Sequence, residues 1–348
     1  MQPRESSKIV RARAPLRLGL AGGGTDVSPF SDEFGGFVLN VTIGKYASVT
    51  LTPRNDGLVE FVAADRELSW NGPATEVLPL VKGLELHVGV YNRIVREFEG
   101  NESLPVTVVT HSEAPPGSGL GSSSTLVVAL IQAFREYLTL PLGEYDVARL
   151  AYEIERIELG LAGGKQDQYA AAFGGLNFME FYGDRVIVNP LRIKPEHRAE
   201  LESSLVLFFT GVSRESANII NEQVQNVKTG KEASVQAMHA LKVEAVHMKE
   251  AILKGDFEAL AMAMRNSWDA KKRMANQISN AKINEIYEAA IKEGARAGKV
   301  SGAGGGGFMM FIVDPAKRPR VMKCLAEFSG SVSTCMFAEH GAHSWRVA

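Results

Sequence analysis

The segment from Pro116 to Ser124 constrains this chain more than any other, because it places a run of glycines and serines directly before a long helical pattern. It reads Pro-Gly-Ser-Gly-Leu-Gly-Ser-Ser-Ser, and residues Ser122–Leu138 contain neither glycine nor proline. Glycine lets backbone N–H groups approach an anion closely, and a helix N-terminus adds partial positive charge. The segment therefore predicts a phosphate-binding loop whose serine hydroxyls ligate Mg²⁺ or phosphate oxygen.

This loop differs from two common nucleotide motifs. No lysine follows its glycines, as a P-loop requires, and the pattern is not the G-x-G-x-x-G of dinucleotide-binding folds. A glycine-rich turn capped by serine is the structural alternative. The density of glycine and hydroxyl residues at a helix start favours a nucleotide phosphate site, which comprises Pro116, Gly117, Ser118, Gly119, Leu120, Gly121, Ser122, Ser123 and Ser124.

A second glycine cluster follows an apolar, strand-like run that contains one cation, Arg17. Because an unpaired buried cation is costly, Arg17 is either half of a structural salt bridge or a cation beside a catalytic carboxylate or a transferring phosphoryl group. Asp26, after three glycines, either accepts a hydrogen bond from a sugar hydroxyl or caps the following turn. The cluster predicted to contact substrate is Gly22, Gly23, Gly24, Thr25 and Asp26.

The third glycine cluster, Ser301–Gly307, directly precedes the apolar strand pattern Phe308–Val313. Four consecutive glycines are entropically costly to order, so the segment is either a flexible linker or a place where backbone approaches a ligand closely. A linker rarely leads directly into a buried strand. We therefore expect this segment to close over a cleft, with Gly302, Ala303, Gly304 and Gly305 contacting substrate.

Two carboxylates lie between these clusters. Glu155, on the helical pattern Gly143–Leu159, is either a Mg²⁺ ligand facing the serine loop or an exposed helix carboxylate. Asp167, after the glycine-containing loop 160–164, is either a helix N-cap or a base that accepts the proton of a sugar hydroxyl during phosphoryl transfer. An adjacent Arg17 would keep Asp167 ionised.

The chain length of 348 residues predicts two packed lobes with a cleft between them. We expect an α+β fold, with a mixed sheet in residues 1–195 and a helix-rich lobe in residues 196–348. The expected strands are Val38–Ile43, Ala47–Leu51, Leu58–Ala63, Val106–Thr110, Leu205–Phe209 and Phe308–Val313, with a hairpin at Leu176–Asn189. Further helices are expected at Glu215–Val227, Ala233–Leu253, Phe257–Met274, Asn280–Glu293 and Arg318–Phe328.

Net charge and hydropathy give no indication of a nucleic-acid or membrane partner. The chain has 38 basic and 40 acidic residues, a formal charge of -2, which gives no reason to expect a nucleic-acid partner. No stretch approaches the roughly 18 apolar residues of a membrane span, and no secretory h-region opens the chain. Cys324 and Cys335 are expected to be free thiols in a reducing cytoplasm. The oligomeric state stays open, with a homodimer as one option.

Together, these segments resemble the GHMP kinases, the family of galactokinase, homoserine kinase, mevalonate kinase and phosphomevalonate kinase. The run around Arg17, the loop Pro116–Ser124 and the cluster Ser301–Gly307 resemble its three motifs, in order and across nearly the whole chain. The resemblance implies an S5-like N-terminal domain and a ferredoxin-like C-terminal domain with extra helices. It also implies ATP as phosphoryl donor with Mg²⁺ at Ser123 and Glu155, and Asp167 as base beside Arg17.

The acceptor is suggested by the second cluster. Where galactokinases carry Glu-His before Thr-Asp, this chain has Gly23-Gly24, which leaves more room at the sugar. The Gly-Gly-Gly-Thr-Asp segment, with Gly163–Tyr169, resembles the family branch that acts on D-glycero-D-manno-heptose 7-phosphate. That implies transfer to the anomeric hydroxyl, giving the 1,7-bisphosphate for surface-glycan synthesis. An L-fucose 1-kinase and a non-catalytic sugar-sensing protein are the alternatives.

The resemblance leaves two contacts unassigned. A phosphate already on the sugar needs cations, and the candidates are Arg11, Arg13, Lys45, Lys165, Arg214 and Lys271, of which Lys165 is the one we include among the substrate-binding residues. Each of these is alternatively a solvated surface charge. For the adenine ring, the candidates are Trp70 and the segment Val77–Leu84.

Overall fold

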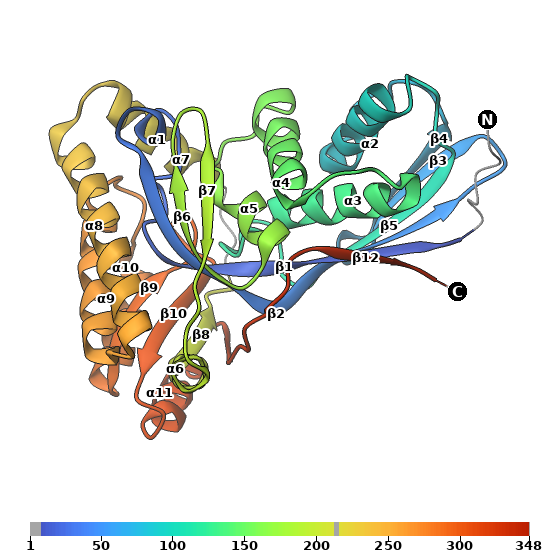
Figure 1. Ribbon diagram of the computed structural model, residues 1–348. Coiled ribbons are helices and arrows are strands. Elements are labelled where there is room, and N and C mark those ends of the chain that lie inside the picture. The colour runs from blue at the N-terminus through green and yellow to red at the C-terminus, as the bar shows by residue number, and fades with distance from the viewer. Residues whose placement is uncertain (1–7, 212–215, 348) are drawn as a thin grey trace.

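The computed structural model describes residues 8–211 and 216–347, which form two lobes, each built on one β-sheet (Figure 1). The larger sheet has eight strands in the order β12-β1-β2-β5-β3-β4, with β6 paired to β2 and β7 paired to β6. Its strands are β1 (Val10–Ala21), β2 (Gly36–Pro53), β3 (Leu58–Ala63), β4 (Leu68–Pro73), β5 (Val106–Ser112), β6 (Leu176–Phe181), β7 (Val186–Pro190) and β12 (His343–Arg346).

Helices α2 (Glu85–Phe98), α3 (Ser122–Leu138), α4 (Glu144–Tyr152) and α5 (Gln166–Phe173) lie on one face of this sheet (Figure 1). Strand β3 alternates buried and partly exposed residues, as expected for a strand with only one covered face. The helix α3 is the most enclosed of these helices, since both its N-terminal serines and its apolar residues are largely buried. The start of this helix is therefore largely enclosed by the rest of the protein.

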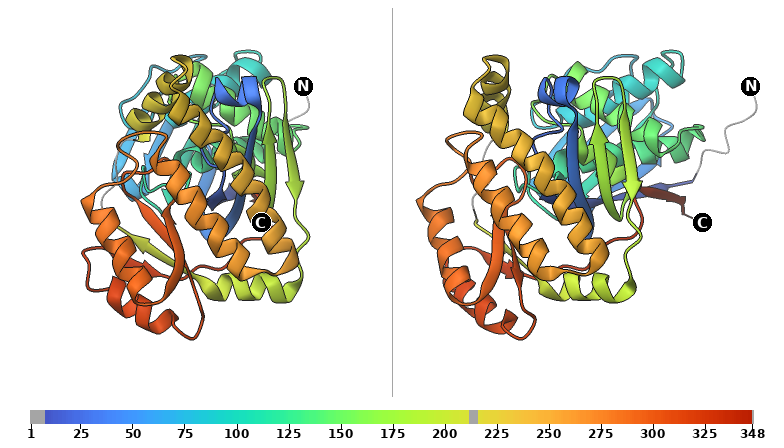
Figure 2. Two further views of the ribbon diagram at one scale, coloured as in Figure 1. Left: turned by 90° about the vertical axis from the view of Figure 1, so that its left-hand side faces the viewer. Right: turned by 60° about the vertical axis from the view of Figure 1, so that its left-hand side comes forward.

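The second lobe contains a four-stranded antiparallel sheet in the order β11-β8-β10-β9. All six residues of β10 are buried, so both faces of this sheet are covered. Helices α8 and α9 pack on each other and stand beside the sheet (Figure 2). The elements are α6 (Pro195–Ser204), β8 (Leu205–Phe209), α7 (Ser216–Lys228), α8 (Glu232–Lys254), α9 (Phe257–Lys272), α10 (Ala281–Lys292), β9 (Ala295–Val300), β10 (Phe308–Val313), α11 (Arg318–Leu325) and β11 (Ser331–Ser333), with the short α1 (Phe30–Phe34) in the first lobe.

The α+β, two-lobed architecture expected from the sequence is confirmed, but one strand prediction is wrong. The two strands expected at Val38–Ile43 and Ala47–Leu51 are one continuous strand, β2. Its first half pairs with β6 and its second half with β5 on one side, while β1 pairs with both halves on the other side. Gly44, at the change of partner, is held by a hydrogen bond from its N–H to Met336 O (2.8 Å).

Several elements were not predicted: α1, β4, α2, α6, β9, β11 and β12. Strand β12, near the end of the chain, pairs antiparallel with the start of β1, with Val10 opposite Arg346. The chain therefore returns to the first sheet after completing the second, while the domain boundary at 195/196 stays a prediction. Glu215, where a helix was expected to begin, lies outside the described residues, and α7 begins at Ser216. None of the helices in the described ranges is long and apolar enough to cross a membrane.

Candidate active site

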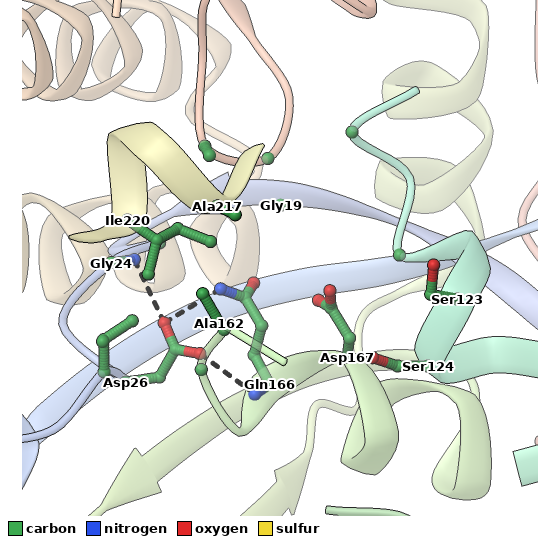
Figure 3. Close-up of a pocket in the computed structure, with 18 of the residues that line it drawn as sticks. Gly19, Gly24, Asp26, Ser123, Ser124, Ala162, Gln166, Asp167, Ala217 and Ile220 are labelled. Atoms are coloured by element: carbon green, nitrogen blue, oxygen red, sulfur yellow. Dashed lines mark hydrogen bonds between the residues drawn. The ribbon is translucent and has the colours of Figure 1, made fainter. Parts of the chain in front are cut away.

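Residues from both lobes line one cleft, and all three glycine clusters reach it. The first lobe contributes β1, the start of α3 and the loop before α5, while the second lobe contributes α7, α9, β9 and the loop after β9. Figure 3 shows Asp167, Ser123 and Ser124 on one side of this cleft and Ala217 and Ile220 of α7 on the other. The cleft therefore contains the catalytic and metal-binding residues predicted from the sequence.

Arg17 and Asp167 form a close ion pair in this cleft. Arg17 Nε donates to Asp167 Oδ1 (2.7 Å), and Arg17 Nη2 lies 2.6 Å from the same oxygen. The arginine side chain is 4% exposed and the aspartate side chain 20%, so the aspartate still faces the cleft. Asp167 is the second residue of α5 and not its N-cap, which is Lys165. The first turn of a helix favours a negative charge at this position.

The phosphate loop is bound tightly to Arg17 and Asp167. Arg17 Nη1 donates to Gly119 O (2.6 Å), and the Arg17 N–H donates to Leu120 O (3.1 Å). Gly121, with φ of 77°, precedes α3, and a Cβ on this residue would lie 3.1 Å from Asp167 Cγ. Only glycine combines this left-handed conformation with such close approach. The loop, the base candidate and the cation are thus in direct contact with one another.

The third glycine cluster packs directly on the phosphate loop. Ser301 Oγ donates to Gly119 O (2.8 Å), and the Phe308 N–H donates to Ser118 O (2.8 Å). A Cβ on Gly302 would lie 2.7 Å from Gly119 Cα. The sequence predicted close backbone approach of this cluster to a ligand. In the structure the close approach is to the backbone of the phosphate loop. Gly302 and Ala303 line the cleft, but Gly304 and Gly305 contact Ile278, and their substrate role stays a prediction.

Glu155 is fully buried at the back of the cleft, which excludes the alternative of an exposed helix carboxylate. It lies in the π-helical segment Glu153–Glu158, a conformation that is rare and found mostly at functional sites. Its Oε2 accepts a hydrogen bond from Gln168 Nε2 (2.6 Å), while Oε1 has no hydrogen-bond partner in the described part of the chain. Burial raises the pKa of this carboxyl above its ordinary value of 4.5, an effect that Arg156 opposes.

These features fit a Mg²⁺ site. Mg²⁺ binds hard oxygen ligands and commonly takes one or two carboxylates plus substrate phosphates. Glu155 offers a buried carboxylate oxygen, Oε1, which lies 3.6 Å from Arg156 Nη1 and has no hydrogen-bond partner in the described residues. Ser123 lines the same cleft at the start of α3. Ser124 is already engaged, because its Oγ accepts hydrogen bonds from Arg156 Nη2 and Gln168 Nε2 (both 3.1 Å).

The second glycine cluster, Gly22–Asp26, is called the sugar loop below, and its residues divide into two groups. Gly23, Gly24 and Asp26 line the cleft, whereas Gly22 packs on the Phe37 carbonyl, which a Cβ at this glycine would overlap. Thr25 is fully buried, and its Oγ1 accepts from the Phe37 N–H (3.0 Å). A structural role therefore accounts for the placement of Gly22 and Thr25.

Asp26 is the residue that joins the sugar loop to α5. Its Oδ2 accepts from the Gln166 N–H (3.0 Å), and its Oδ1 accepts from Gln166 Nε2 (2.9 Å) and the Gly24 N–H (3.0 Å) (Figure 3). Asp26 thus satisfies an otherwise unpaired N–H at the start of the helix that carries Asp167. The sequence offered a turn cap or a sugar ligand, and the structure adds this long-range cap.

Of the cations considered for the sugar phosphate, Lys271 is the one that lines the cleft among those the structure describes. Lys165 Nζ lies 3.4 Å from Asp32 Oδ1 and donates to Tyr182 O (3.2 Å), away from the cleft lining. Arg13 donates to His343. Arg11 and Lys45 likewise do not line the cleft, nor do the adenine candidates Trp70 and Val77–Leu84, and Arg214 lies outside the described residues.

Several cleft residues, Arg156 among them, were not predicted from sequence. Lys299, the fifth residue of β9, is 2% exposed and lines the cleft. Its signal was a lone lysine in a small, apolar run just before the third glycine cluster, the same signal that identified Arg17. Gln166 also lines the cleft and lies within Gly163–Tyr169, the segment that carries the family resemblance, although no role was predicted for it. The α7 residues Ala217, Ile220 and Gln223 line the cleft as well, and they had no distinguishing sequence pattern.

A carboxylate base candidate held by a buried cation, against a glycine-rich loop at a helix N-terminus, defines a phosphotransferase site. The model for the GHMP kinases N terminal domain matches residues 85–175, and the GHMP kinases C terminal model matches residues 248–329. The chain belongs to the GHMP kinases, and it is an enzyme of this family.

Within this family, the chain is similar to several individual sugar kinases. A D-glycero-alpha-D-manno-heptose 7-phosphate kinase of Campylobacter jejuni is 49% identical, over 98% of this chain and 100% of its own length. The crystal structure of a D-glycero-D-manno-heptose 1-phosphate kinase from Bacteroides thetaiotaomicron has a TM-score of 0.83 and 44% identity, covering 97% of this chain and 99% of that one. An L-fucokinase/L-fucose-1-P guanylyltransferase of Bacteroides fragilis is 25% identical over 92% of this chain and 36% of its own length.

Proposed function

We propose that this enzyme transfers the γ-phosphoryl group of ATP to the anomeric hydroxyl of D-glycero-D-manno-heptose 7-phosphate, giving the 1,7-bisphosphate. The observation that carries the proposal is the 49% identity, over essentially both full lengths, to a heptose 7-phosphate kinase. The Arg17–Asp167 pair in the cleft also supports it, because it provides a carboxylate that can act as the base. We further propose a cytoplasmic role in supplying nucleotide-activated heptose for surface glycans.

The proposed reaction uses Asp167 as the base. Its carboxylate accepts the proton of the anomeric hydroxyl while that oxygen bonds to the γ-phosphorus and the bond to the leaving ADP oxygen breaks. Arg17 holds the carboxylate toward the cleft and stabilises developing negative charge. Backbone N–H groups at the start of α3 are available to the nucleotide phosphates, because the first N–H groups of a helix have no partner within it.

Mg²⁺ completes the proposed donor site. Glu155 and Ser123 would hold it, and when bound it would neutralise charge on the phosphate oxygens. Gln168 fixes the Glu155 carboxylate through Oε2, while Oε1, 3.6 Å from Arg156 Nη1, accepts no hydrogen bond in the described residues and can ligate a cation. The residues of this chain thus prepare an oxygen ligand before the nucleotide binds.

The position of the acceptor phosphate needs a direct test, because the two heptose-specific relatives are named for a 7-phosphate and a 1-phosphate. The experiment is an ATP-coupled assay with heptose 7-phosphate, heptose 1-phosphate, free heptose and L-fucose, with ³¹P NMR of the product. We expect preference for heptose 7-phosphate and a new anomeric phosphate signal. Turnover of fucose alone would support the fucokinase alternative, and absence of turnover with every sugar would support a sugar-sensing role.

A further inference from the structure

We propose that Lys271 and Lys299, two buried lysines of the second lobe, bind phosphoryl oxygens in this cleft and so replace the lysine that the phosphate loop lacks. The proposal rests on the proposed kinase function and names cations that complete its site. Phosphoryl oxygens reach this cleft from two sources, the γ-phosphoryl group of ATP and a phosphate on the acceptor sugar. The shared chemistry is a phosphate dianion, and the experiment below separates its sources.

Lys271 lies where the sugar loop and the third glycine cluster meet. Its Nζ donates to Gly302 O (2.6 Å) and Gly23 O (3.4 Å), and the residue is 3% exposed. Gly302 in turn packs on Gly119 of the phosphate loop. The ammonium group is therefore positioned between the expected places of the acceptor and the nucleotide phosphates.

Lys299 approaches the same region from β9. Its Nζ donates to Gly19 O (2.9 Å) and Leu20 O (3.0 Å), at an irregularity in the pairing of β1 with β2. An ammonium group has three N–H donors, so two hydrogen bonds to carbonyls leave one donor for a ligand. The same count applies to Lys271. Both lysines line the cleft, so the remaining donor belongs to a residue that borders the proposed ligand site.

The charges in the cleft favour an anionic ligand. Asp167 is paired with Arg17, and both oxygens of Asp26 are engaged by N–H groups. Glu155, the third carboxylate that lines the cleft, lies 3.6 Å from Arg156 and accepts a hydrogen bond from Gln168. In residues 8–211 and 216–347, neither Lys271 nor Lys299 forms an ion pair with a carboxylate. Buried charges are normally paired, so two lysines held by backbone carbonyls alone are most readily explained by a bound phosphate that supplies the missing negative charge.

Electrostatic repulsion among Arg17, Lys271 and Lys299 also favours an anionic ligand. Burial, followed by the charge of Arg17, lowers the pKa of Lys271 from 10.5 to about 8. Burial, followed by the charges of Lys271 and Arg17, lowers the pKa of Lys299 well below its ordinary value. Three cations that disfavour one another's charge gain most from an anion placed among them.

The test compares Lys271→Met and Lys299→Met with Lys282→Met. Lys282 is the matched control. Among the described residues its Nζ also donates to backbone carbonyls alone, Thr210 O (3.3 Å) and Ser329 O (3.4 Å), but Lys282 does not line the cleft. Calorimetry measures dissociation constants for ADP, for a non-hydrolysable ATP analogue, and for inorganic phosphate in the presence of ADP. Steady-state kinetics measures KM for the sugar phosphate.

Each source gives a distinct result. If the lysines bind the γ-phosphoryl group, the ATP analogue binds about 10- to 100-fold more weakly while ADP binding changes by less than about 3-fold. If they bind the acceptor phosphate, KM for the sugar phosphate rises by that factor and both nucleotides bind as before. Unchanged binding of the analogue, inorganic phosphate and sugar phosphate would overturn the proposal. The phosphate and nucleotide measurements hold even if heptose 7-phosphate is not the acceptor, so the two proposals fail separately.

A measurement on the unmodified enzyme covers variants that do not fold. The groups facing Lys271 are Arg17 of β1, Lys299 of β9, Asp26 of the sugar loop and Asp167 of α5. A phosphate bound among them raises the pKa of Lys271, so binding inorganic phosphate without Mg²⁺ at about pH 8.5 should take up protons. Calorimetry in two buffers of different ionisation enthalpy detects this uptake, and its absence would contradict the proposal.

Discussion

Arg17 and Asp167 are 150 positions apart in the sequence, yet an arginine nitrogen and a carboxylate oxygen of this pair are 2.6 Å apart. We expect Asp167→Asn to reduce kcat by about 10²- to 10⁴-fold, because the amide cannot accept the hydroxyl proton, while ATP affinity changes little. Stopped-flow kinetics and nucleotide titration measure the two quantities. Near-normal turnover would mean that Asp167 only orients the hydroxyl and that catalysis comes from positioning and electrostatics.

Gly121→Ala should damage catalysis through a steric contact. The new Cβ would lie 3.1 Å from Asp167 Cγ, so the carboxylate or the phosphate loop must move. Gly57→Ala is the control, because Gly57 has a similar φ of 72° but a Cβ there would have no atom of the described residues within 4 Å. Both variants should lose about 1–2 kcal/mol of unfolding free energy from left-handed strain, measured in urea. Only Gly121→Ala should also lose about 10-fold or more in kcat; equal activity of the two variants would argue against the contact.

Asp26→Ala distinguishes capping from sugar binding. The substitution leaves the Gln166 N–H of α5 without its acceptor, so we expect a loss of about 1–3 kcal/mol in unfolding free energy and a lower kcat through displacement of Asp167. Asp256→Ala serves for comparison, since Asp256 caps α9 outside the cleft by accepting from Ala259 N (2.9 Å). That variant should lose about 1 kcal/mol and no activity. A higher sugar KM at unchanged stability would instead identify Asp26 as a sugar ligand.

The raised pKa of the buried Glu155 carboxyl should make the free energy of unfolding depend on pH. Burial raises its pKa in the folded protein above 4.5, so folding favours the protonated carboxyl. Its contribution to stability is complete below the unfolded-state pKa and is lost as pH rises through the folded-state pKa. Glu155→Gln should therefore flatten this loss in Mg²⁺-free protein, as measured by urea unfolding between about pH 4 and 8. A curve parallel to that of the unmodified protein would contradict the assignment.

Glu155→Gln should also weaken the dependence of the rate on Mg²⁺. An amide oxygen is a poorer Mg²⁺ ligand than a carboxylate, so half-maximal activity should require about 10-fold more Mg²⁺ or more. Glu153→Gln is the matched control on the same helical segment, because Glu153 pairs with Arg93 (2.7 Å) and does not line the cleft. Its Mg²⁺ titration should be unchanged. Equal Mg²⁺ titrations of the two variants would show that Glu155 is not a Mg²⁺ ligand.

Elements with a strong local pattern were predictable. The range predicted for α3 matches the observed helix, because a glycine loop, serines and an uninterrupted apolar run all act within one segment. Strand β12 could not be predicted in the same way, since its four residues His343–Arg346 form a strand by pairing with β1. The division of β2 was mispredicted because the interruption at Gly44-Lys45 is a local signal, whereas the ladder partners of β2 come from distant segments.

The sequence by itself determined which chemical groups are present: a glycine loop at a helix start, a lone arginine in an apolar strand, and carboxylates at Glu155 and Asp167. Only the tertiary structure decided how they are used. It paired Arg17 with Asp167, engaged Asp26 at the start of α5, and packed the third glycine cluster on the phosphate loop. The physical reason is that buried charges and polar groups must find partners, and these partners come from segments that only folding brings together.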